Sequence, residues 1–284
     1  MEPRTRSDYT AAAVDAAFSV LIELFGMLGE FREHIAVIGG WVPALLLPET
    51  TEQVRTVDVD LAVDFRTITE DTYPTLLRAL LSRGYRQNKQ QPFRFSKTVT
   101  PDNGPPVEVQ VDLLAGEYGG TGKGHRTQPA QDVRARKARG ADLVFEHCIQ
   151  VRVEGRLPNG ARDTVIIKVA DAVAFLTMKG MAAHDRRKEK DCYDIFYCVR
   201  NYPGGVDALV DVFRPHLDNR LVAEGLAKIR GKFLSPEHVG PVAVADFLEV
   251  TDPDERAIVV RDAYARVNAL LDQLRVEMWE DLAE

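Results

Sequence analysis

The stretch RTVDVDLAV, residues Arg55–Val63, decides the fold. It is rich in Val and has the composition of a β-strand, yet it carries two carboxylates, Asp58 and Asp60. Side chains two positions apart in a strand lie on the same face, so the two acids share one face while Val59 and Leu61 occupy the other. Such a pair of acids is either the solvated face of an edge strand or one half of a site that holds a cation.

A second stretch, VEVQVDLL at residues 107–114, alternates in the same way and ends its polar face at Asp112. If the two strands are neighbours, Asp112 becomes a third acid beside Asp58 and Asp60. Three adjacent carboxylates repel one another, and a hard divalent cation removes that cost. The three acids are therefore expected to bind Mg²⁺ or Mn²⁺, which takes its remaining ligands from water and from the phosphates of an NTP substrate.

A glycine pair lies upstream, in AVIGGWVPALLL at residues 36–47. The pattern predicts a short strand, a tight turn at Gly39 and Gly40, and a helix that tolerates Pro43 in its first turn. Glycines allow backbone N–H groups and a helix N-terminus to approach a phosphate. Each feature is weak alone, but a strand, a glycine pair, a helix, an Asp-x-Asp strand and a later single-Asp strand, in this order, form a much more specific pattern.

This order resembles the nucleotidyltransferase superfamily that includes DNA polymerase beta. In two respects the sequence departs from the usual pattern: Trp41 stands where many members have Ser or a small residue, and 17 residues separate Gly40 from Asp58. The resemblance implies an NTP substrate and a nucleotide site near the turn. The residues predicted for that site are Gly39, Gly40, Trp41, Arg55, Thr56, Lys179 and Lys190.

The whole chain is predicted to be α+β. Its 284 residues suffice for two domains. Strand and helix patterns alternate up to residue 169, beginning with an amphipathic helix that Ser7 or Asp8 could cap, whereas only helical periodicity follows. We therefore expect a polymerase-beta-like nucleotidyltransferase lobe at residues 1–169, with a mixed sheet and flanking helices, and an α-helical lobe at residues 170–284.

The helical lobe contains FLTMKGMAAHDRRKEKDCYDIFYCV, residues 175–199. It resembles the signature of AbiEii/AbiGii-type (MenT-like) nucleotidyltransferase toxins, in which a lysine precedes Lys-Asp-x-x-Asp. Lys179 corresponds to the first lysine and would hold the triphosphate. Lys190 and Asp191 correspond to the Lys-Asp pair of the signature, and Asp194 corresponds to its second Asp. Both acids are predicted site residues. Alternatively, Asp191 caps a helix and Asp194 pairs with Lys179 or Arg187.

Two segments are rich in Lys and Arg, the stretch 123–139 and the run 186–190. They are either solvated faces or an RNA-binding surface, because phosphate contacts by Lys and Arg supply most sequence-independent affinity for RNA. The run 186–190 continues the preceding helix or forms a loop. The predicted RNA-binding residues are Arg134, Arg136, Lys137, Arg186 and Arg187.

The resemblance implies a toxin of a toxin–antitoxin or phage-defence system that transfers NMP from an NTP to RNA, such as the 3′ end of tRNA, with an antitoxin protein as partner. Two alternatives remain: transfer to a small molecule or a protein hydroxyl, and a binding module without turnover. A net charge of −7 argues against a uniformly basic surface. The lack of a signal peptide or membrane span predicts a cytoplasmic location.

Overall fold

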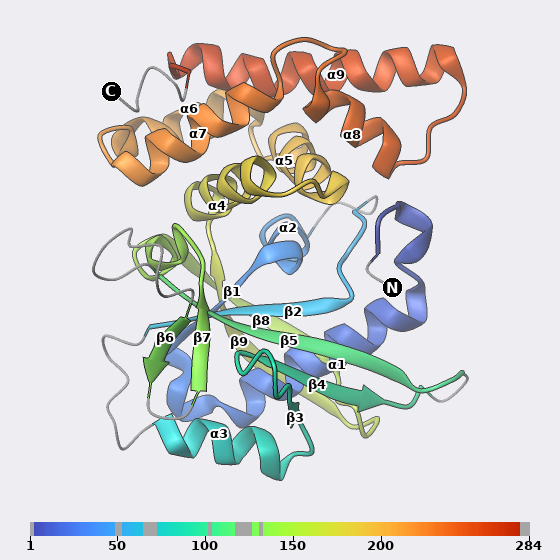
Figure 1. Cartoon of the computed structure of the whole chain (residues 1–284), viewed down its shortest axis with the longest axis vertical. Helices are drawn as coiled ribbons and strands as arrows, with labels where there is room; N and C mark the ends of the chain where they lie inside the picture. The colour runs from blue at the N-terminus through green and yellow to red at the C-terminus, as the bar shows by residue number, and fades with distance from the viewer. Residues whose placement is uncertain are drawn as a thin grey trace. The chain divides into compact units, whose positions relative to one another are not determined.

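The computed structural model describes residues 3–48, 53–64, 73–101, 104–116, 127–130 and 133–278 (Figure 1). These residues form two compact units. The sheet unit comprises Tyr9–Leu45 and Arg55–Asp171, and the helical unit comprises Met1–Asp8, Leu46–Val54 and Ala172–Glu284. The combination of a mixed sheet with flanking helices and a separate group of helices confirms the predicted α+β class.

The sheet of the first unit is mixed, and its main path runs in the order β3-β4-β5-β2-β1-β9-β8, with β7 joining β5 and β6 joining β7. Strand β5 pairs with β2 along one side. Along its other side it pairs first with β4 and then, past the start of β4, with β7. The strands are β1 (Ile35–Ile38), β2 (Asp58–Val63), β3 (Arg86–Gln87), β4 (Arg94–Val99), β5 (Val107–Ala115), β6 (Thr127–Ala130), β7 (Val133–Lys137), β8 (Cys148–Arg156) and β9 (Arg162–Ala170).

The two acidic strands, β2 and β5, are parallel neighbours near the middle of this sheet. Their apolar positions face the core, since Val59, Leu61, Val109 and Val111 are fully buried. This alternation is the one that the sequence predicts, and it leaves the acids of β2 on the opposite, half-buried face.

Helix α1 (Ala11–Met27) contacts β2, β5, β8 and β9 and covers one face of the sheet with buried apolar side chains (Figure 1). Its N-cap is Thr10, whose hydroxyl accepts a hydrogen bond from the Ala13 amide, so the expectation of a Ser7 or Asp8 cap is wrong. The Asp8 carboxylate instead accepts hydrogen bonds from the Arg4 and Thr5 amides and closes the preceding turn. Two further helices of this unit are α2 (Val42–Leu46) and α3 (Tyr73–Ser82), and its described 3₁₀ helices are η2 (Gly29–His34), η3 (Gly39–Trp41) and η4 (Ala141–Phe145).

The second unit is helical, as the periodicity after residue 169 predicts. Helices α4 and α7 cross closely, because a Cβ on Gly180 would run into the Gly225 carbonyl and a Cβ on Gly225 would lie 2.7 Å from the Thr177 Cα. Among the described residues, no helix is long and apolar enough to span a bilayer. The helices are α4 (Ala172–Asp185), α5 (Glu189–Asn201), α6 (Gly205–Phe213), α7 (Arg220–Lys232), α8 (Val239–Phe247) and α9 (Pro253–Gln273).

The structure shows how parts of the two basic segments fold. Helix α4 ends at Asp185 and α5 begins at Glu189, so residues 186–188 form a loop, which is one of the two predicted alternatives. Within the stretch 123–139, β6 and β7 form an antiparallel hairpin that the sequence pattern did not predict. The two-residue period is hidden there because the strands are short and charged residues occupy both even and odd positions, as Arg134, Arg136 and Lys137 do.

Candidate active site

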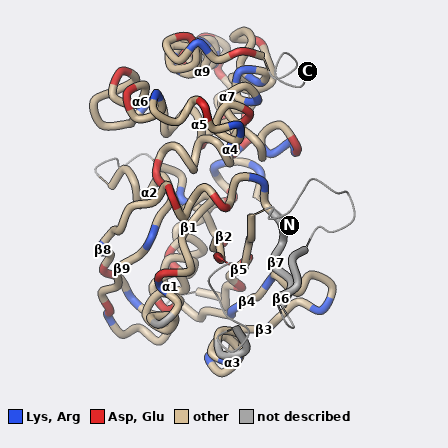
Figure 2. Tube along the Cα trace, turned by 90° about the vertical axis from the view of Figure 1, so that its left-hand side faces the viewer, with Lys and Arg blue, Asp and Glu red and all other residues tan. Residues whose placement is uncertain are grey.

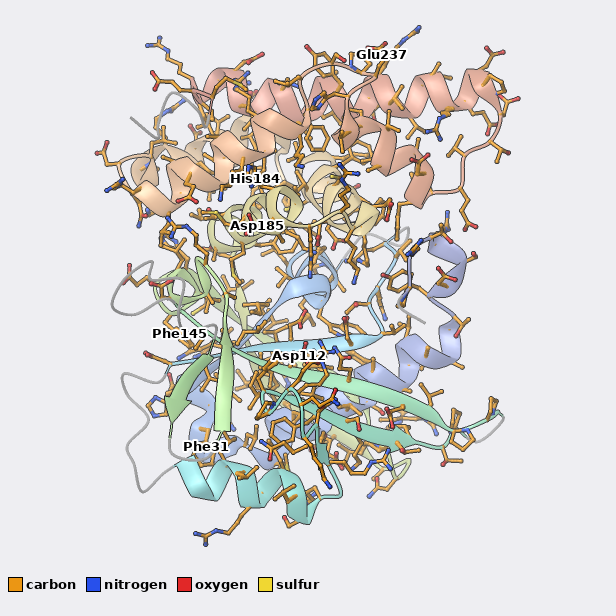
Figure 3. All side chains as sticks on the ribbon, in the orientation of Figure 1. Phe31, Asp112, Phe145, His184, Asp185 and Glu237 are labelled. Carbon is orange, nitrogen blue, oxygen red and sulfur yellow. The ribbon has the colours of Figure 1, made fainter. Side chains whose placement is uncertain are left out.

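The acids of β2 and β5 come together in the sheet unit. Asp58 and Asp60 lie two residues apart on β2 and are both half-buried. Asp60 is the direct register partner of Asp112 on the parallel strand β5, and of Ile38 on β1. The strands β2 and β5 are therefore neighbours, as the sequence predicts, and their register places Asp60 beside Asp112. Figure 3 labels Asp112 on β5.

The glycine turn packs against this acidic face. Gly39 has a φ of +71°, and a Cβ at this position would collide with the Asp60 carboxylate. A Cβ on Gly40 would lie 2.7 Å from the Thr56 Cβ. Both glycines are thus required by the close approach of η3 to β2, and their predicted contact with phosphate stays a prediction.

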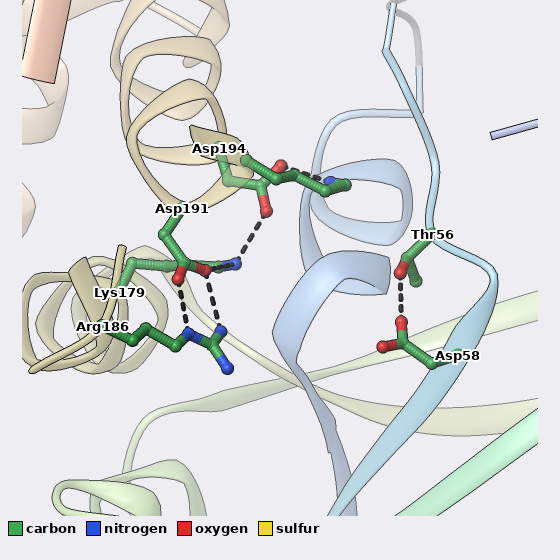
Figure 4. Close-up of polar contacts among 7 residues, drawn as sticks. Thr56, Asp58, Lys179, Arg186, Asp191 and Asp194 are labelled. Atoms are coloured by element: carbon green, nitrogen blue, oxygen red, sulfur yellow. Dashed lines mark hydrogen bonds and ion pairs between the residues drawn. The ribbon is translucent and has the colours of Figure 1, made fainter. Parts of the chain in front are cut away.

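Asp58 is held by two neighbours. The Thr56 hydroxyl donates a hydrogen bond to the Asp58 carboxylate (Figure 4). The Trp41 indole N–H donates to the Asp58 carbonyl over 2.8 Å, and its ring is fully buried beside Phe18 with 5.4 Å between centroids. The structure therefore gives both side chains a supporting position behind Asp58, whereas Arg55 is exposed. The nucleotide contacts of these three residues stay predictions.

Asp112 is paired with an arginine that the sequence patterns did not single out. Arg94 opens β4 opposite Asp112, and its Nε and Nη2 donate to Asp112 Oδ1 and Oδ2 over 2.9 and 2.8 Å. Gln110 Nε2 donates to Oδ2 over 3.2 Å. The stretch FRFSKTV predicts a strand, but only its antiparallel register shows that Arg94 faces Asp112.

The charge of Arg94 acts on the whole acidic group. The hydrogen bonds with Asp112 raise the pKa of Arg94, and the negative charges of Asp112, Asp60 and Asp58 contribute to the same shift. The Arg94 side chain is 28% exposed and that of Asp112 is 9% exposed. Arg94 therefore supplies positive charge at the place where the sequence predicts a cation.

The residues present suit a hard divalent cation, because Asp58, Asp60 and Asp112 offer oxygen ligands from two adjacent strands. Within the described ranges, however, no three Asp, Glu, His or Cys side chains are arranged as a metal-binding group. The Asp112 carboxylate faces Arg94 instead. The three-carboxylate metal site remains a prediction.

In the helical unit, the predicted site residues form a buried ionic network (Figure 4). Lys179 Nζ donates to Asp191 Oδ1 and Asp194 Oδ2 over 2.8 and 2.7 Å. Lys190 Nζ donates to Asp194 Oδ1 over 2.7 Å. Arg186 Nε donates to Asp191 Oδ2 over 2.7 Å, and its Nη2 donates to Asp191 Oδ1 over 3.0 Å. All four carboxylate oxygens thus accept at least one charge-assisted hydrogen bond.

Burial and charge oppose one another in this network. Burial by itself lowers the pKa of Lys179, but Asp191 and Asp194 outweigh it and leave the pKa raised. Burial likewise raises the pKa of Asp191, but Lys179 and Arg186 outweigh it and leave the pKa lowered. Lys179 and Asp191 are therefore both charged at neutral pH, and the network is an ion cluster.

The helix-cap alternative for Asp191 is wrong, because Lys188 is the N-cap of α5 and Asp191 lies in the first turn. The alternative that Asp194 pairs with Lys179 describes the structure correctly. Lys190 is 3% exposed. Catalytic and triphosphate-binding roles for these residues stay predictions.

The predicted RNA-binding residues fall in two places. Arg134, Arg136 and Lys137 lie on β7, which runs parallel to the end of β5 with Arg136 as the register partner of Leu114. Their side chains are outside the described part of the structure. Arg186 and Arg187 are exposed in the loop between α4 and α5.

Comparison with curated proteins found no match. Among solved structures, the crystal structure of a proposed nucleotidyltransferase from H. pylori is similar, with 12% identity and a TM-score of 0.45, over 94% of this chain and 97% of that chain. The sequence model of a family described as Nucleotidyltransferase matches residues 17–194, well over half of the 284 residues, and spans Asp58, Asp60, Asp112, Asp191 and Asp194. The chain therefore belongs to this family and is a nucleotidyltransferase.

Proposed function

We propose that this nucleotidyltransferase transfers NMP from an NTP to a hydroxyl group of RNA, such as the 3′ end of tRNA, and releases pyrophosphate. We also propose that it is a magnesium-dependent toxin restrained by an antitoxin protein. The observation that carries the transfer is the register of β2 and β5, which sets Asp60 beside Asp112 on neighbouring strands with the Gly39 turn against Asp60.

The chemistry follows from the acids of the sheet unit. Asp58 and Asp60 would hold the divalent cation with Asp112, and the bound cation would neutralise charge on the triphosphate and on the leaving pyrophosphate. Asp112 would accept the proton of the acceptor hydroxyl, whose oxygen forms a bond to the α-phosphorus. The bond between the α-phosphorus and the bridging oxygen breaks, and pyrophosphate leaves with the electron pair. Thr56 and Trp41 keep Asp58 in place throughout.

An RNA acceptor is supported by the position of β7. The backbone register continues from Asp112 to Leu114 on β5 and across to Arg136 on β7. A strand containing Arg134, Arg136 and Lys137 therefore runs beside the end of the acidic strand. Lys and Arg in such a position would bind the phosphates of an acceptor RNA and bring its terminal hydroxyl toward the acids.

The direct test is incubation of the protein with each α-labelled NTP, Mg²⁺ and total RNA, followed by electrophoresis. We expect label from one or more NTPs on RNA of tRNA size with the wild-type protein and none with Asp60→Asn. The matched control is Glu108→Gln, which removes an exposed carboxylate from β5 and should leave the transfer unchanged. Label on protein or on a small molecule would select the corresponding alternative acceptor, and no label in any fraction would favour a binding module.

The toxin role rests on the resemblance of residues 175–199 and needs a separate test. Expression of the wild-type chain alone in bacteria should arrest growth, whereas equal amounts of the Asp60→Asn protein should not. Normal growth with the active wild-type enzyme would contradict the toxin role without affecting the transferase activity.

A further inference from the structure

Arg94 occupies a position in the acidic site that the transfer reaction does not explain. It is the first residue of β4, and its guanidinium binds both oxygens of Asp112. Asp112 also accepts a hydrogen bond from Gln110. A carboxylate bound in this bidentate manner has most of its acceptor directions occupied, so it cannot serve as a cation ligand in the same geometry.

The electrostatic position of Arg94 leads to the same conclusion. Asp60 and Asp58 both interact with its charge in addition to Asp112. A guanidinium and a divalent cation that both lie close to the three carboxylates repel each other, because their like charges share one partly buried site. Binding of the cation therefore disfavours the Arg94–Asp112 pair, and the pair disfavours binding of the cation.

Of the two partners, Arg94 is the one that can move. The Asp112 side chain is 9% exposed and is also bound by Gln110, whereas the Arg94 side chain is 28% exposed at the start of its strand. The guanidinium lies 5.8 Å from the Phe93 ring centroid and faces solvent over part of its surface. A rotation of this long side chain would release Asp112 without moving β5.

We propose that Arg94 masks Asp112 in the nucleotide-free protein and yields this carboxylate only when a divalent cation binds to the acidic site. The inference rests on the proposed metal-dependent function and adds a regulatory step to it. Arg94 acts through Asp112 and is thus a positioning residue. The free enzyme then binds metal weakly, and the cation that arrives with an NTP completes the site.

The test is the affinity of the nucleotide-free protein for Mn²⁺, measured by electron paramagnetic resonance of the free ion. Arg94→Gln should bind Mn²⁺ about ten-fold more tightly than the wild type, the factor that corresponds to one charge-assisted hydrogen bond. Arg94→Lys, which keeps the charge but cannot bind in a bidentate manner, should lie between them. Circular dichroism establishes that each variant is folded.

Two controls separate masking from a general change in charge. Arg86→Gln removes the same charge from the neighbouring strand β3, where Arg86 pairs with the exposed Glu108, and should leave the Mn²⁺ affinity unchanged. Asp112→Asn added to Arg94→Gln should abolish the gain. An unchanged or weaker affinity of Arg94→Gln and Arg94→Lys would overturn the inference.

The outcome is distinguishable from failure of the proposed function. A gain in affinity in Arg94→Gln, with no nucleotide transfer by the wild type, would uphold the masking and reject the transferase proposal. Transfer by the wild type, with no gain in the variant, would do the reverse. No Mn²⁺ binding by any variant would overturn the masking.

Discussion

At the scale of single residues, Asp58 depends on a small shell of contacts that fix a flexible carboxylate. The Thr56 hydroxyl binds its side chain and the Trp41 indole binds its backbone carbonyl. Groups that hold a ligand in this way restrict its rotamers and its orientation before the metal arrives. Under the proposed metal-dependent function, their removal should affect metal binding more than folding.

Thr56→Val keeps the shape of the side chain but removes the hydroxyl. Because Asp58 loses its side-chain donor, we expect the Mn²⁺ affinity and the rate of nucleotide transfer to fall about ten-fold. Thr56→Ser restores the hydroxyl and should recover most of both. Equal values for Thr56→Val and the wild type would show that this hydrogen bond does not position Asp58.

Gly39 and Gly160 offer a matched pair for a second prediction. Both have positive φ, of +71° and +85°, but a Cβ on Gly160 meets nothing within 4 Å, whereas one on Gly39 meets the Asp60 carboxylate. Gly160→Ala should cost only about 1 kcal/mol of unfolding free energy from backbone strain. Gly39→Ala should cost more in urea denaturation and should also lose metal affinity. Similar effects of the two changes would remove the case for a close contact at Gly39.

At the scale of elements, the network of Lys179, Asp191 and Asp194 ties α4 to α5. It connects helices that the loop at residues 186–188 separates, so it stabilises the angle between them. A buried ion cluster of this kind adds little net free energy, but loss of one member leaves uncompensated charge.

Lys179→Met should lower the unfolding free energy by about 3–5 kcal/mol, because Asp191 and Asp194 lose their shared partner. Arg186→Gln removes a partner that is 49% exposed and should cost less than about 1 kcal/mol. Urea denaturation of the two variants checks the difference. Equal losses would contradict the central position of Lys179.

The pKa of Asp191 gives the network a pH dependence of known sign. Its folded pKa lies below its unfolded value of 3.8, so its stabilising contribution is fully present above that value and is lost as the pH falls toward the folded pKa. We therefore expect this contribution to stay constant from pH 8 to pH 5 and to decline below about pH 4. The difference in urea midpoint between wild type and Asp191→Asn should shrink over the acid range only.

At the scale of the whole molecule, the negative net charge of −7 coexists with a basic strand beside the acidic site. Figure 2 shows both acidic and basic positions on α9, whose sequence contains Asp and Glu as well as Arg residues. The proposed sequence-independent binding of RNA would depend on local segments such as β7 and the exposed loop between α4 and α5.

Reversal of Arg134, Arg136 and Lys137 to Glu should weaken RNA binding and reduce its dependence on salt, while NTP binding stays intact. The control reverses Arg152, Arg156 and Arg162, which are exposed on the β8–β9 hairpin, and changes the net charge equally. Filter binding of labelled tRNA at several salt concentrations distinguishes the two. RNA affinity that is unchanged, or lowered equally by both triple variants, would refute a specific role for β7.

The sequence by itself determined the local features of this protein. The two-residue alternation of Asp58 and Asp60 predicts a strand with one acidic face, and the structure has that strand. The order of the glycine pair and the acidic strands, followed by helical periodicity, resembles the nucleotidyltransferase superfamily, and this resemblance predicted the fold class and the enzyme class. These signals can be read along the chain, because each depends on the residues of one element or on the order in which the elements follow one another.

Only the tertiary structure decided which side chains meet. Arg94 faces Asp112 because of the register of β4 on β5, and Trp41 reaches the Asp58 carbonyl because η3 packs on β2. The sequence left the partner of Asp194 open between Lys179 and Arg187, and packing of α4 against α5 selected Lys179. A register shift of two residues would keep the alternation of buried and exposed positions but replace each cross-strand partner, so the local pattern does not choose between such registers. The physical reason is that contacts between distant segments are selected by burial and packing of the whole unit.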